Sequence, residues 1–211
     1  NGFVMGKRQL CFAGSFSGDM EISGKSISSN GKSDGFVAQL NTEGKVFWIK
    51  NLGGAFDDEI KCVALDNQDN LYVAGDFKYA IELDKEYTAL QNTYIFVLKY
   101  TPDGKISWSR QLGAEGESYN TVTDLEMAAD GKFFLSGAFR GTLQNSPEVK
   151  SQGNSKNAFL ARYSTDGQKD WMMGTNSQNE NKLWIKYNKQ TGSLFISGYF
   201  IVQNVVPGIR T

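Results

Sequence analysis

The sequence predicts an all-β protein, a β-propeller of four-stranded antiparallel blades, and three observations lead to this fold class. Two different phrases recur along the chain with a common period of about 61 residues. Each period holds four short apolar runs separated by turns rich in Gly, Asn and Asp. No window keeps the apolar spacing of a helix for more than one turn.

The first phrase is an apolar run with a glycine near its end. It occurs as LCFAGSF, LYVAGDF, FFLSGAF and LFISGYF, at residues 10–16, 71–77, 133–139 and 194–200. Its glycines are spaced by 61, 62 and 61 residues, at Gly14, Gly75, Gly137 and Gly198. A constant spacing over four copies indicates a structural repeat.

The second phrase joins a glycine turn to a tryptophan. It reads LNTEGKVFWIKNLG at 40–53, YTPDGKISWSRQLG at 100–113 and YSTDGQKDWMMGTN at 163–176. The turn glycine precedes the tryptophan by four residues each time, in the pairs Gly44 and Trp48, Gly104 and Trp108, and Gly167 and Trp171. Asp-Gly between apolar runs is a strong hairpin signal, so this phrase predicts the third and fourth strands of each blade.

The second period shows the expected blade most clearly, with strands over 59–65, 71–77, 94–100 and 105–111. A lone sheet of this size is marginally stable, whereas radial repetition covers both of its faces. A β-solenoid is the alternative repeat architecture, but its coils are much shorter than 61 residues.

The phase of the repeat divides the chain into blades of residues 1–52, 53–113, 114–175 and 176–211, the last one incomplete. This gives about three and a half blades, whereas a closed propeller needs four to eight. We therefore expect the segment to belong to a longer polypeptide. Self-association into a ring is the alternative.

Composition argues against several functional classes. The 22 Lys and Arg residues balance 23 Asp and Glu, which removes the electrostatic basis for nucleic-acid binding. No apolar run reaches the length of a membrane span. The chain has no His, no P-loop and no Gly-x-Ser-x-Gly motif. We accordingly predict no catalytic residue, no cofactor and no metal ligand.

Two cysteines, Cys11 and Cys62, lie in strand-like apolar runs. We expect both to be buried free thiols that behave as small hydrophobic residues. A single disulfide is the alternative.

The composite stretch FVAQLNTEGKVFWIKNLGGAFDDEIKCVALDNQDNLYVAGDF at 36–77 resembles the SBBP-type β-propeller repeat. The resemblance implies an exported, cell-surface protein of a bacterium, typically of the Bacteroidota, and a scaffold rather than an activity. The Asp/Glu-Gly-x-x-x-Trp phrase also resembles the tryptophan-docking motif of quinoprotein-like propellers. That resemblance implies that Trp48, Trp108 and Trp171 pack over the adjacent blade and donate the indole N–H to a carbonyl; ligand stacking is the alternative.

The segments between the two hairpins of each blade vary most, over 17–34, 78–93 and 140–157. Variable loops on a rigid repeat scaffold are frequent binding sites. The tentative rim contacts are the tyrosines Tyr79 and Tyr87 of the segment 78–93, together with Asp57 and Asp58, which lie in the loop that enters the first strand of the second blade. Exposed decoration and simple turn formation are the competing interpretations.

These observations favour a non-catalytic binding or scaffolding module of the bacterial cell surface, which would engage a protein or a glycan through a rim. One alternative is part of a propeller enzyme, either a quinoprotein-like dehydrogenase or a polysaccharide lyase, with its catalytic residues outside this segment. Another is a structural subunit of an outer-membrane protein complex.

Overall fold

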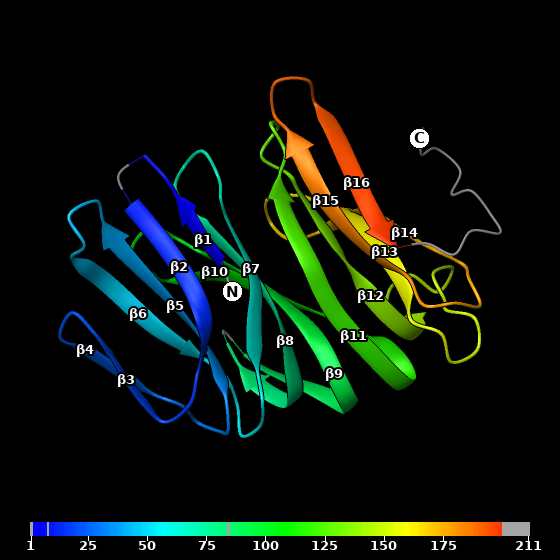
Figure 1. Cartoon of the computed structure of the whole chain (residues 1–211), viewed down its shortest axis with the longest axis horizontal. Coiled ribbons are helices and arrows are strands. Elements are labelled where there is room, and N and C mark those ends of the chain that lie inside the picture. The colour runs from blue at the N-terminus through cyan, green and yellow to red at the C-terminus, as the bar shows by residue number, and fades with distance from the viewer. Residues whose placement is uncertain (1, 8, 84, 200–211) are drawn as a thin grey trace. The chain divides into compact units, whose positions relative to one another are not determined.

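The computed structural model describes residues 2–7, 9–83 and 85–199, and every regular element within them is a β-strand (Figure 1). The chain forms two compact units, Asn1–Leu112 and Gly113–Thr211. Each unit is described by itself below.

The N-terminal unit contains two four-stranded antiparallel sheets. The first has the order β1 (Gly2–Met5), β2 (Gln9–Phe16), β5 (Asp34–Asn41) and β6 (Val46–Leu52). The second has the order β7 (Glu59–Leu65), β8 (Leu71–Glu82), β9 (Glu86–Tyr100) and β10 (Ile106–Leu112). Neighbours in the chain are neighbours in the sheet, apart from β3 (Asp19–Ile22) and β4 (Lys25–Ser28), which form a separate hairpin between β2 and β5.

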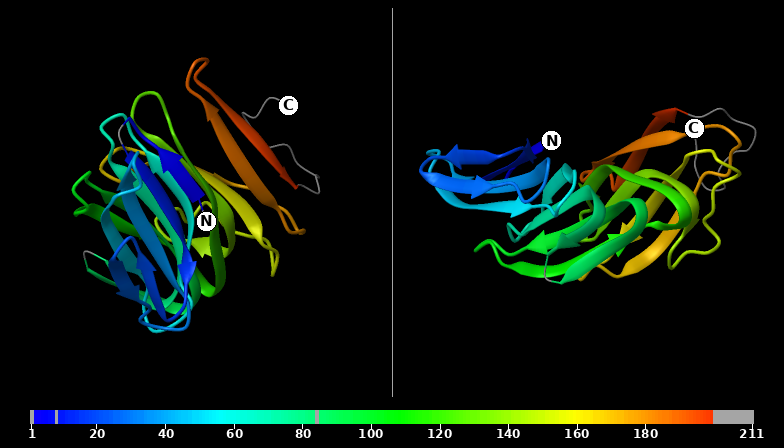
Figure 2. Two further views of the ribbon diagram at one scale, coloured as in Figure 1. Left: turned by 60° about the vertical axis from the view of Figure 1, so that its left-hand side comes forward. Right: turned by 90° about the horizontal axis from the view of Figure 1, so that it is seen from below.

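The C-terminal unit contains one complete sheet and one further hairpin. The sheet has the order β11 (Ala114–Met127), β12 (Phe133–Leu143), β13 (Asn157–Tyr163) and β14 (Lys169–Gly174). The hairpin consists of β15 (Lys182–Asn188) and β16 (Ser193–Tyr199), and it is the two-stranded orange-to-red ribbon in both views of Figure 2.

Within each unit, the first strand of one sheet packs against the face of the sheet before it. In the N-terminal unit, β7 lies against β1, β2 and β5, and Cys11 and Val37 share a core with Ile60 and Phe77. In the C-terminal unit, β15 lies against β11, β12 and β13, and Leu183 and Ile185 pack with Phe134 and Leu160. In the second strands β8 and β12, residues 71–77 and 133–139 are buried on both faces of their sheets.

The turns between third and fourth strands have the same geometry in all three complete sheets. Each is closed by a backbone hydrogen bond of 2.9 Å from the first residue of the turn to the carbonyl of the fifth, over residues 41–45, 101–105 and 164–168. The fourth residue has a positive φ of 85°, 79° and 77°, at Gly44, Gly104 and Gly167. Glycine adopts this conformation without steric cost, which explains why glycine recurs at this position in every copy of the glycine-and-tryptophan phrase.

Cys11 and Cys62 are both buried free thiols, as predicted from their apolar surroundings. Burial, with a smaller contribution from Asp69, raises the pKa of the Cys11 thiol to about 12. Because the thiolate is the reactive species, this thiol is unreactive at neutral pH.

Two of the segments expected to be irregular contain regular structure. Residues 19–28 form the β3–β4 hairpin, and β8 and β9 extend through 78–93, with Ile81 paired with Tyr87. The extension buries Ile81 and Tyr87 in the core of the N-terminal unit, so burial of their side chains stabilises strands in a stretch whose polar composition predicts a loop.

Candidate functional site

An exposed aromatic pair lies where the β6–β7 connection meets the bend in β8. Phe56 belongs to the connection and Tyr79 to β8, and their side chains are 42% and 50% exposed. The ring centroids are 4.3 Å apart with an angle of 38° between the planes. The two rings therefore support each other while their remaining surfaces face solvent.

Tyr79 has an unusual backbone conformation. It sits at a register shift between Lys78 and Ala80, and its φ is 62°. The other described non-glycine residues with positive φ are Ser23, Asp69 and Asn145. Short polar side chains tolerate the left-handed region, whereas a bulky residue there is strained by roughly 1–2 kcal/mol. Strain of this kind is concentrated at functional sites.

The loop that carries Phe56 is fastened to its surroundings by three contacts. The Asp58 N–H donates to the Ser33 carbonyl at 2.7 Å. The Asp58 carboxylate accepts hydrogen bonds from the N–H groups of Gly54, at 2.6 Å, and Lys78, at 3.0 Å. Gly54 begins the Phe56 loop and Lys78 precedes Tyr79, so Asp58 positions both halves of the aromatic pair.

Asp57 and Asp58 have different environments although they are adjacent. Asp57 is exposed and pairs with the Lys78 ammonium at 3.2 Å, an ion pair of little energetic value that adds polar groups beside Tyr79. Asp58 is buried. The prediction that Asp58 contacts a partner is therefore wrong, because its carboxylate is occupied by two backbone donors beneath the surface.

Burial raises the pKa of Asp58 to about 6 despite the two N–H donors, which act in the opposite direction. A folded-state pKa above the usual value of 3.8 means that the folded protein binds the proton more tightly than the unfolded chain. The stability contributed by this group is present below about pH 4 and is lost as the pH rises toward 6. The shift corresponds to at most about 3 kcal/mol, which solvent screening reduces to roughly 1–2 kcal/mol.

Asp58→Asn removes the titrating group. We expect the difference in unfolding free energy, variant minus wild type, to increase by about 1–2 kcal/mol between pH 4 and pH 7, because only the wild type loses the contribution of Asp58 over this range. Urea unfolding of both proteins at several pH values measures this difference. The reciprocal change Asn120→Asp should make the unfolding free energy fall as the pH rises, as Asp58 does in the wild type. A difference between wild type and Asp58→Asn that stays constant with pH would contradict this explanation.

The choice of Asn120 follows from a periodicity that sequence reasoning missed. Ile60, Val122 and Leu183 pair with the repeated glycines of their sheets, and the residues two positions earlier are all buried and polar. These are Asp58, Asn120 and Asn181, spaced by 62 and 61 residues. Asn120 accepts from the Ala114 N–H at 3.1 Å, and Asn181 donates to the Asn179 carbonyl at 2.8 Å.

Tyr87 does not lie beside Tyr79. Its side chain is buried, and its hydroxyl hydrogen-bonds with the Ser109 hydroxyl at 2.7 Å. The prediction that Tyr87 contacts a partner is wrong, because the extension of β9 places its ring in the core.

The repeated glycines of the second strands lie beneath phenylalanine rings. Gly75 pairs with Phe96 and Gly137 with Phe159. A Cβ added at Gly75 would lie 2.6 Å from the Phe96 ring, and one added at Gly137 would lie 2.5 Å from the Phe159 ring. Gly14 pairs with Phe36 in the same way. Glycine is required at Gly75 and Gly137 because a phenylalanine ring and a backbone carbonyl of the neighbouring strand occupy the space of a side chain.

Trp48 reaches from the first sheet to the turn of the second. Its indole N–H donates to the Pro102 carbonyl at 3.5 Å, and its ring covers Gly104, where an added Cβ would be 2.9 Å away. Its ring centroid is 5.3 Å from that of Tyr100. In their own sheets, Trp108 lies beside Tyr72 and Trp171 beside Phe134.

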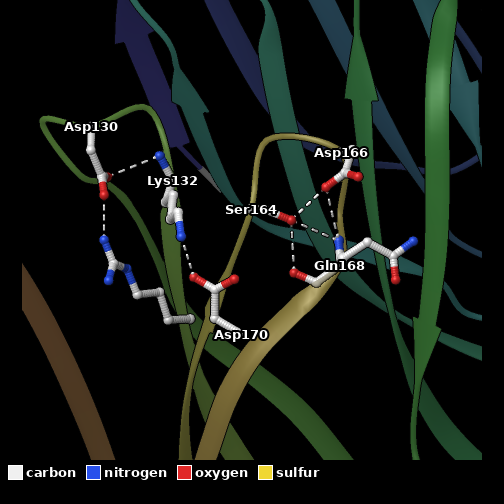
Figure 3. Close-up of polar contacts among 7 residues, drawn as sticks. Asp130, Lys132, Ser164, Asp166, Gln168 and Asp170 are labelled. Carbon is white, nitrogen blue, oxygen red and sulfur yellow. Dashed lines mark hydrogen bonds and ion pairs between the residues drawn. The ribbon is translucent and has the colours of Figure 1, made fainter.

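The hairpin turns of the third sheet are joined by charged side chains (Figure 3). Lys132 pairs with Asp170 at 2.8 Å, and Arg162 pairs with Asp130. Ser164 hydrogen-bonds with Asp166 inside its own turn. Because these charges neutralise one another, we assign the cluster a structural role.

The described part of the chain contains no group of three or more His, Cys, Asp or Glu side chains placed to hold a metal ion. Nor does any helix there have the length and hydrophobicity needed to cross a membrane.

No family model matches the chain. The chain is 25% identical, over 205 residues, to an uncharacterised WD repeat-containing protein of Acanthamoeba polyphaga mimivirus. The match covers 83% of this chain and 14% of that protein. WD repeats form four-stranded propeller blades, and the three complete sheets of this chain also have four strands each. The fold is a β-propeller. Its described residues form three four-stranded blades and the first hairpin of another, which confirms the predicted fold class.

Proposed function

We propose that this chain is a non-catalytic binding module that engages a protein or glycan partner through the aromatic pair Phe56 and Tyr79. The observation that carries the proposal is the left-handed conformation of Tyr79. A half-exposed tyrosine at a strained position costs free energy in the isolated protein. Contact with a partner offsets that cost.

The chemistry of the pair suits such a role. Aromatic rings supply a large rigid contact area at little cost in conformational entropy, and tyrosine is enriched where binding energy is concentrated. The Lys78 and Asp57 pair adds hydrogen-bonding groups at the border of this surface. Asp58 holds the loop and the strand in a fixed relation, so little ordering is needed on binding.

The absence of His from the sequence and the structural contacts of the repeated Trp phrase favour binding over catalysis. We place the module in an exported, cell-surface protein of a bacterium, with a subunit of an outer-membrane complex as the alternative. This proposal rests on the resemblance of residues 36–77 to the SBBP-type repeat.

The substitution Tyr79→Asn should weaken binding to a partner while leaving the stability of the protein nearly unchanged. Asparagine tolerates the left-handed region, so relief of strain offsets loss of the ring stack, and we expect the unfolding free energy to stay within about 1 kcal/mol of the wild type. Binding to a ligand found in a panel of glycans and bacterial surface proteins should weaken at least tenfold. Biolayer interferometry measures the affinity and urea unfolding the stability.

Phe56→Ala should weaken the same interaction, whereas Phe47→Ala is the matched control, because Phe47 is exposed on β6 of the same unit and has no part in the pair. Unchanged affinity in both Tyr79→Asn and Phe56→Ala would refute this binding site.

A further inference from the structure

Asp34, the first residue of β5, is a fully buried carboxylate, with 0% of its surface exposed. Its Oδ2 atom accepts hydrogen bonds from the Asn30 N–H at 2.6 Å and from the Asn51 side-chain amide at 2.9 Å. Its Oδ1 atom is buried without a hydrogen-bond partner. None of the salt bridges in the described part of the chain includes Asp34. Buried charges in proteins are paired or bind metal ions, so the charge of Asp34 lacks its usual compensation.

The side chain of Asn51, on β6, has a second buried oxygen without a partner. Its Nδ2 group donates to the Ser28 carbonyl at 2.9 Å as well as to Asp34. These two bonds use both amide hydrogens, and the Asn51 Oδ1 atom is buried without a hydrogen-bond partner. Each unpartnered oxygen is bonded to the same carbon as one of the two atoms of the Asn51–Asp34 hydrogen bond. Two buried oxygens that lack donors therefore flank a single hydrogen bond.

The backbone around Gly53 holds the carboxylate in place. A Cβ added at Gly53 would lie 2.5 Å from the Asp34 Oδ1 atom. The Gly53 carbonyl accepts a hydrogen bond at 3.0 Å from the side chain of Asn30, the residue whose N–H also binds Asp34. Glycine at such a position allows another group to approach the backbone closely. These contacts keep the unpartnered oxygen of Asp34 beneath the surface.

The third sheet shows how a neutral residue is accommodated at the same position. Asn157 of β13 is the equivalent of Asp34, because each pairs with the last residue of the repeated apolar phrase of its sheet. Asn157 is also 0% exposed. Its amide donates to the Ser177 carbonyl at 3.0 Å, and its Oδ1 atom accepts from the Ser177 N–H at 2.9 Å. An amide at this position is therefore satisfied by the backbone alone.

The first sheet does not provide this arrangement for Asp34. The residue 20 positions later is Gly54, and its N–H donates to Asp58 instead. Burial is the main cause of the raised pKa of Asp58, and the negative charges of Asp34 and Asp57 add to it. The Lys78 ammonium pairs with the Asp57 carboxylate. Among these side chains, negative charge exceeds positive charge.

The chemistry of the two unpartnered atoms selects one kind of ion. Both are oxygens, one from a carboxylate and one from an amide, and Ca²⁺ is bound by oxygens of these types at 2.3–2.6 Å in flexible geometry. Zinc sites use His and Cys ligands. Mg²⁺ demands nearly ideal octahedral geometry and loses its water reluctantly. Calcium is therefore the ion that fits these donors.

We propose that Asp34 and Asn51 form a calcium site in the first sheet, in which the two Oδ1 atoms bind the ion and water supplies the remaining ligands. The site has a single carboxylate, so it differs from the groups of three or more His, Cys, Asp or Glu side chains that are absent from the described residues. The inference does not rest on the aromatic pair, and its tests require no binding partner.

Isothermal titration calorimetry with CaCl₂ measures the binding, using purified protein freed of metal ions with EDTA and then dialysed. We expect one saturable site per chain with a Kd of about 10⁻⁴–10⁻³ M, and at least tenfold weaker binding of Mg²⁺. Nuclear magnetic resonance of ¹⁵N-labelled protein locates the ion. The Asn51 side-chain amide and the Gly53 N–H should shift with the same Kd, whereas the Ser177 N–H should not shift.

Asp34→Asn reproduces the neutral residue of the third sheet and should weaken Ca²⁺ binding at least tenfold. Asp57→Asn is the matched control, because it removes the same charge from an exposed neighbouring side chain, and its Kd should stay within threefold of the wild type. Circular dichroism shows whether each variant is folded. If Asp34→Asn fails to fold, the titration and the resonance shifts of the wild type still decide the question.

Thermal unfolding separates a metal site from a purely structural role of Asp34. In EDTA, Asp34→Asn should be at least as stable as the wild type, because it removes a buried charge without a partner. At a Ca²⁺ concentration ten times the Kd, the Tm of the wild type should rise by at least about 3 °C and that of Asp34→Asn should not change.

The proposal is overturned if Ca²⁺ causes neither a heat of binding nor resonance shifts, a result that would assign the two oxygens to buried water. It is also overturned if Asp34→Asn binds Ca²⁺ as tightly as the wild type, or if Asp57→Asn loses as much affinity as Asp34→Asn. Either of these results would place the ion at exposed carboxylates instead.

Discussion

Gly75→Val is expected to destabilise the N-terminal unit by at least about 3 kcal/mol. A Cβ at this position would lie 2.2 Å from the Glu59 carbonyl oxygen and 2.6 Å from the Phe96 ring. The carbonyl belongs to the neighbouring strand β7, and the ring is fully buried. Neither can move without separating paired strands. Urea unfolding followed by circular dichroism measures the loss.

Gly2→Ala is the control for Gly75→Val. A Cβ at Gly2 meets Val63 at 3.5 Å, an ordinary van der Waals distance. We expect a change within about 0.5 kcal/mol for that variant. A similarly small effect of Gly75→Val would show that the Phe96 ring and the Glu59 carbonyl do not require glycine at this position.

Trp48→Ala should lower the unfolding free energy by roughly 2–3 kcal/mol, less than a fully buried tryptophan because the ring is partly exposed. The loss combines the contact with Gly104, the ring contact with Tyr100 and the hydrogen bond to the Pro102 carbonyl. Tyr100 lies in β9 and the other two partners lie in the turn between β9 and β10, so the variant weakens the attachment of the first blade to the second. Denaturant unfolding is again the measurement.

Phe47→Ala is the comparison for Trp48→Ala. Phe47 is the preceding residue of β6 and is exposed, and we expect its removal to cost less than about 0.5 kcal/mol. Equal effects of the two substitutions would mean that Trp48 does not link the blades.

The periodic features of this fold could be predicted from the sequence because they depend on neighbouring residues. The turn at Gly104 needs a positive φ, and the phrase supplies glycine there in each copy. The glycine of the second strand also recurs, although its partner Phe96 lies 21 residues away in the chain, and only the register shows that the two meet.

The candidate site could be predicted only in part. The sequence marks Tyr79 as an aromatic residue in a variable segment, but its left-handed conformation arises at the register shift in β8. Its partner Phe56 belongs to a different connection, and no local pattern relates the two residues. Tyr87 and Asp58 are buried by tertiary contacts, which composition cannot reveal.

Trp48, in the first copy of the glycine-and-tryptophan phrase, joins the first blade to the second through Gly104, Pro102 and Tyr100. Nuclear magnetic resonance of the isotopically labelled protein tests this contact most directly. We expect nuclear Overhauser effects between the Trp48 indole protons and the α-protons of Gly104, with those α-protons shifted upfield by the ring and returning to ordinary positions in Trp48→Ala. Overhauser effects from the Trp48 indole to residues of the first sheet alone, with unshifted Gly104 α-protons, would show that Trp48 does not join the first blade to the second.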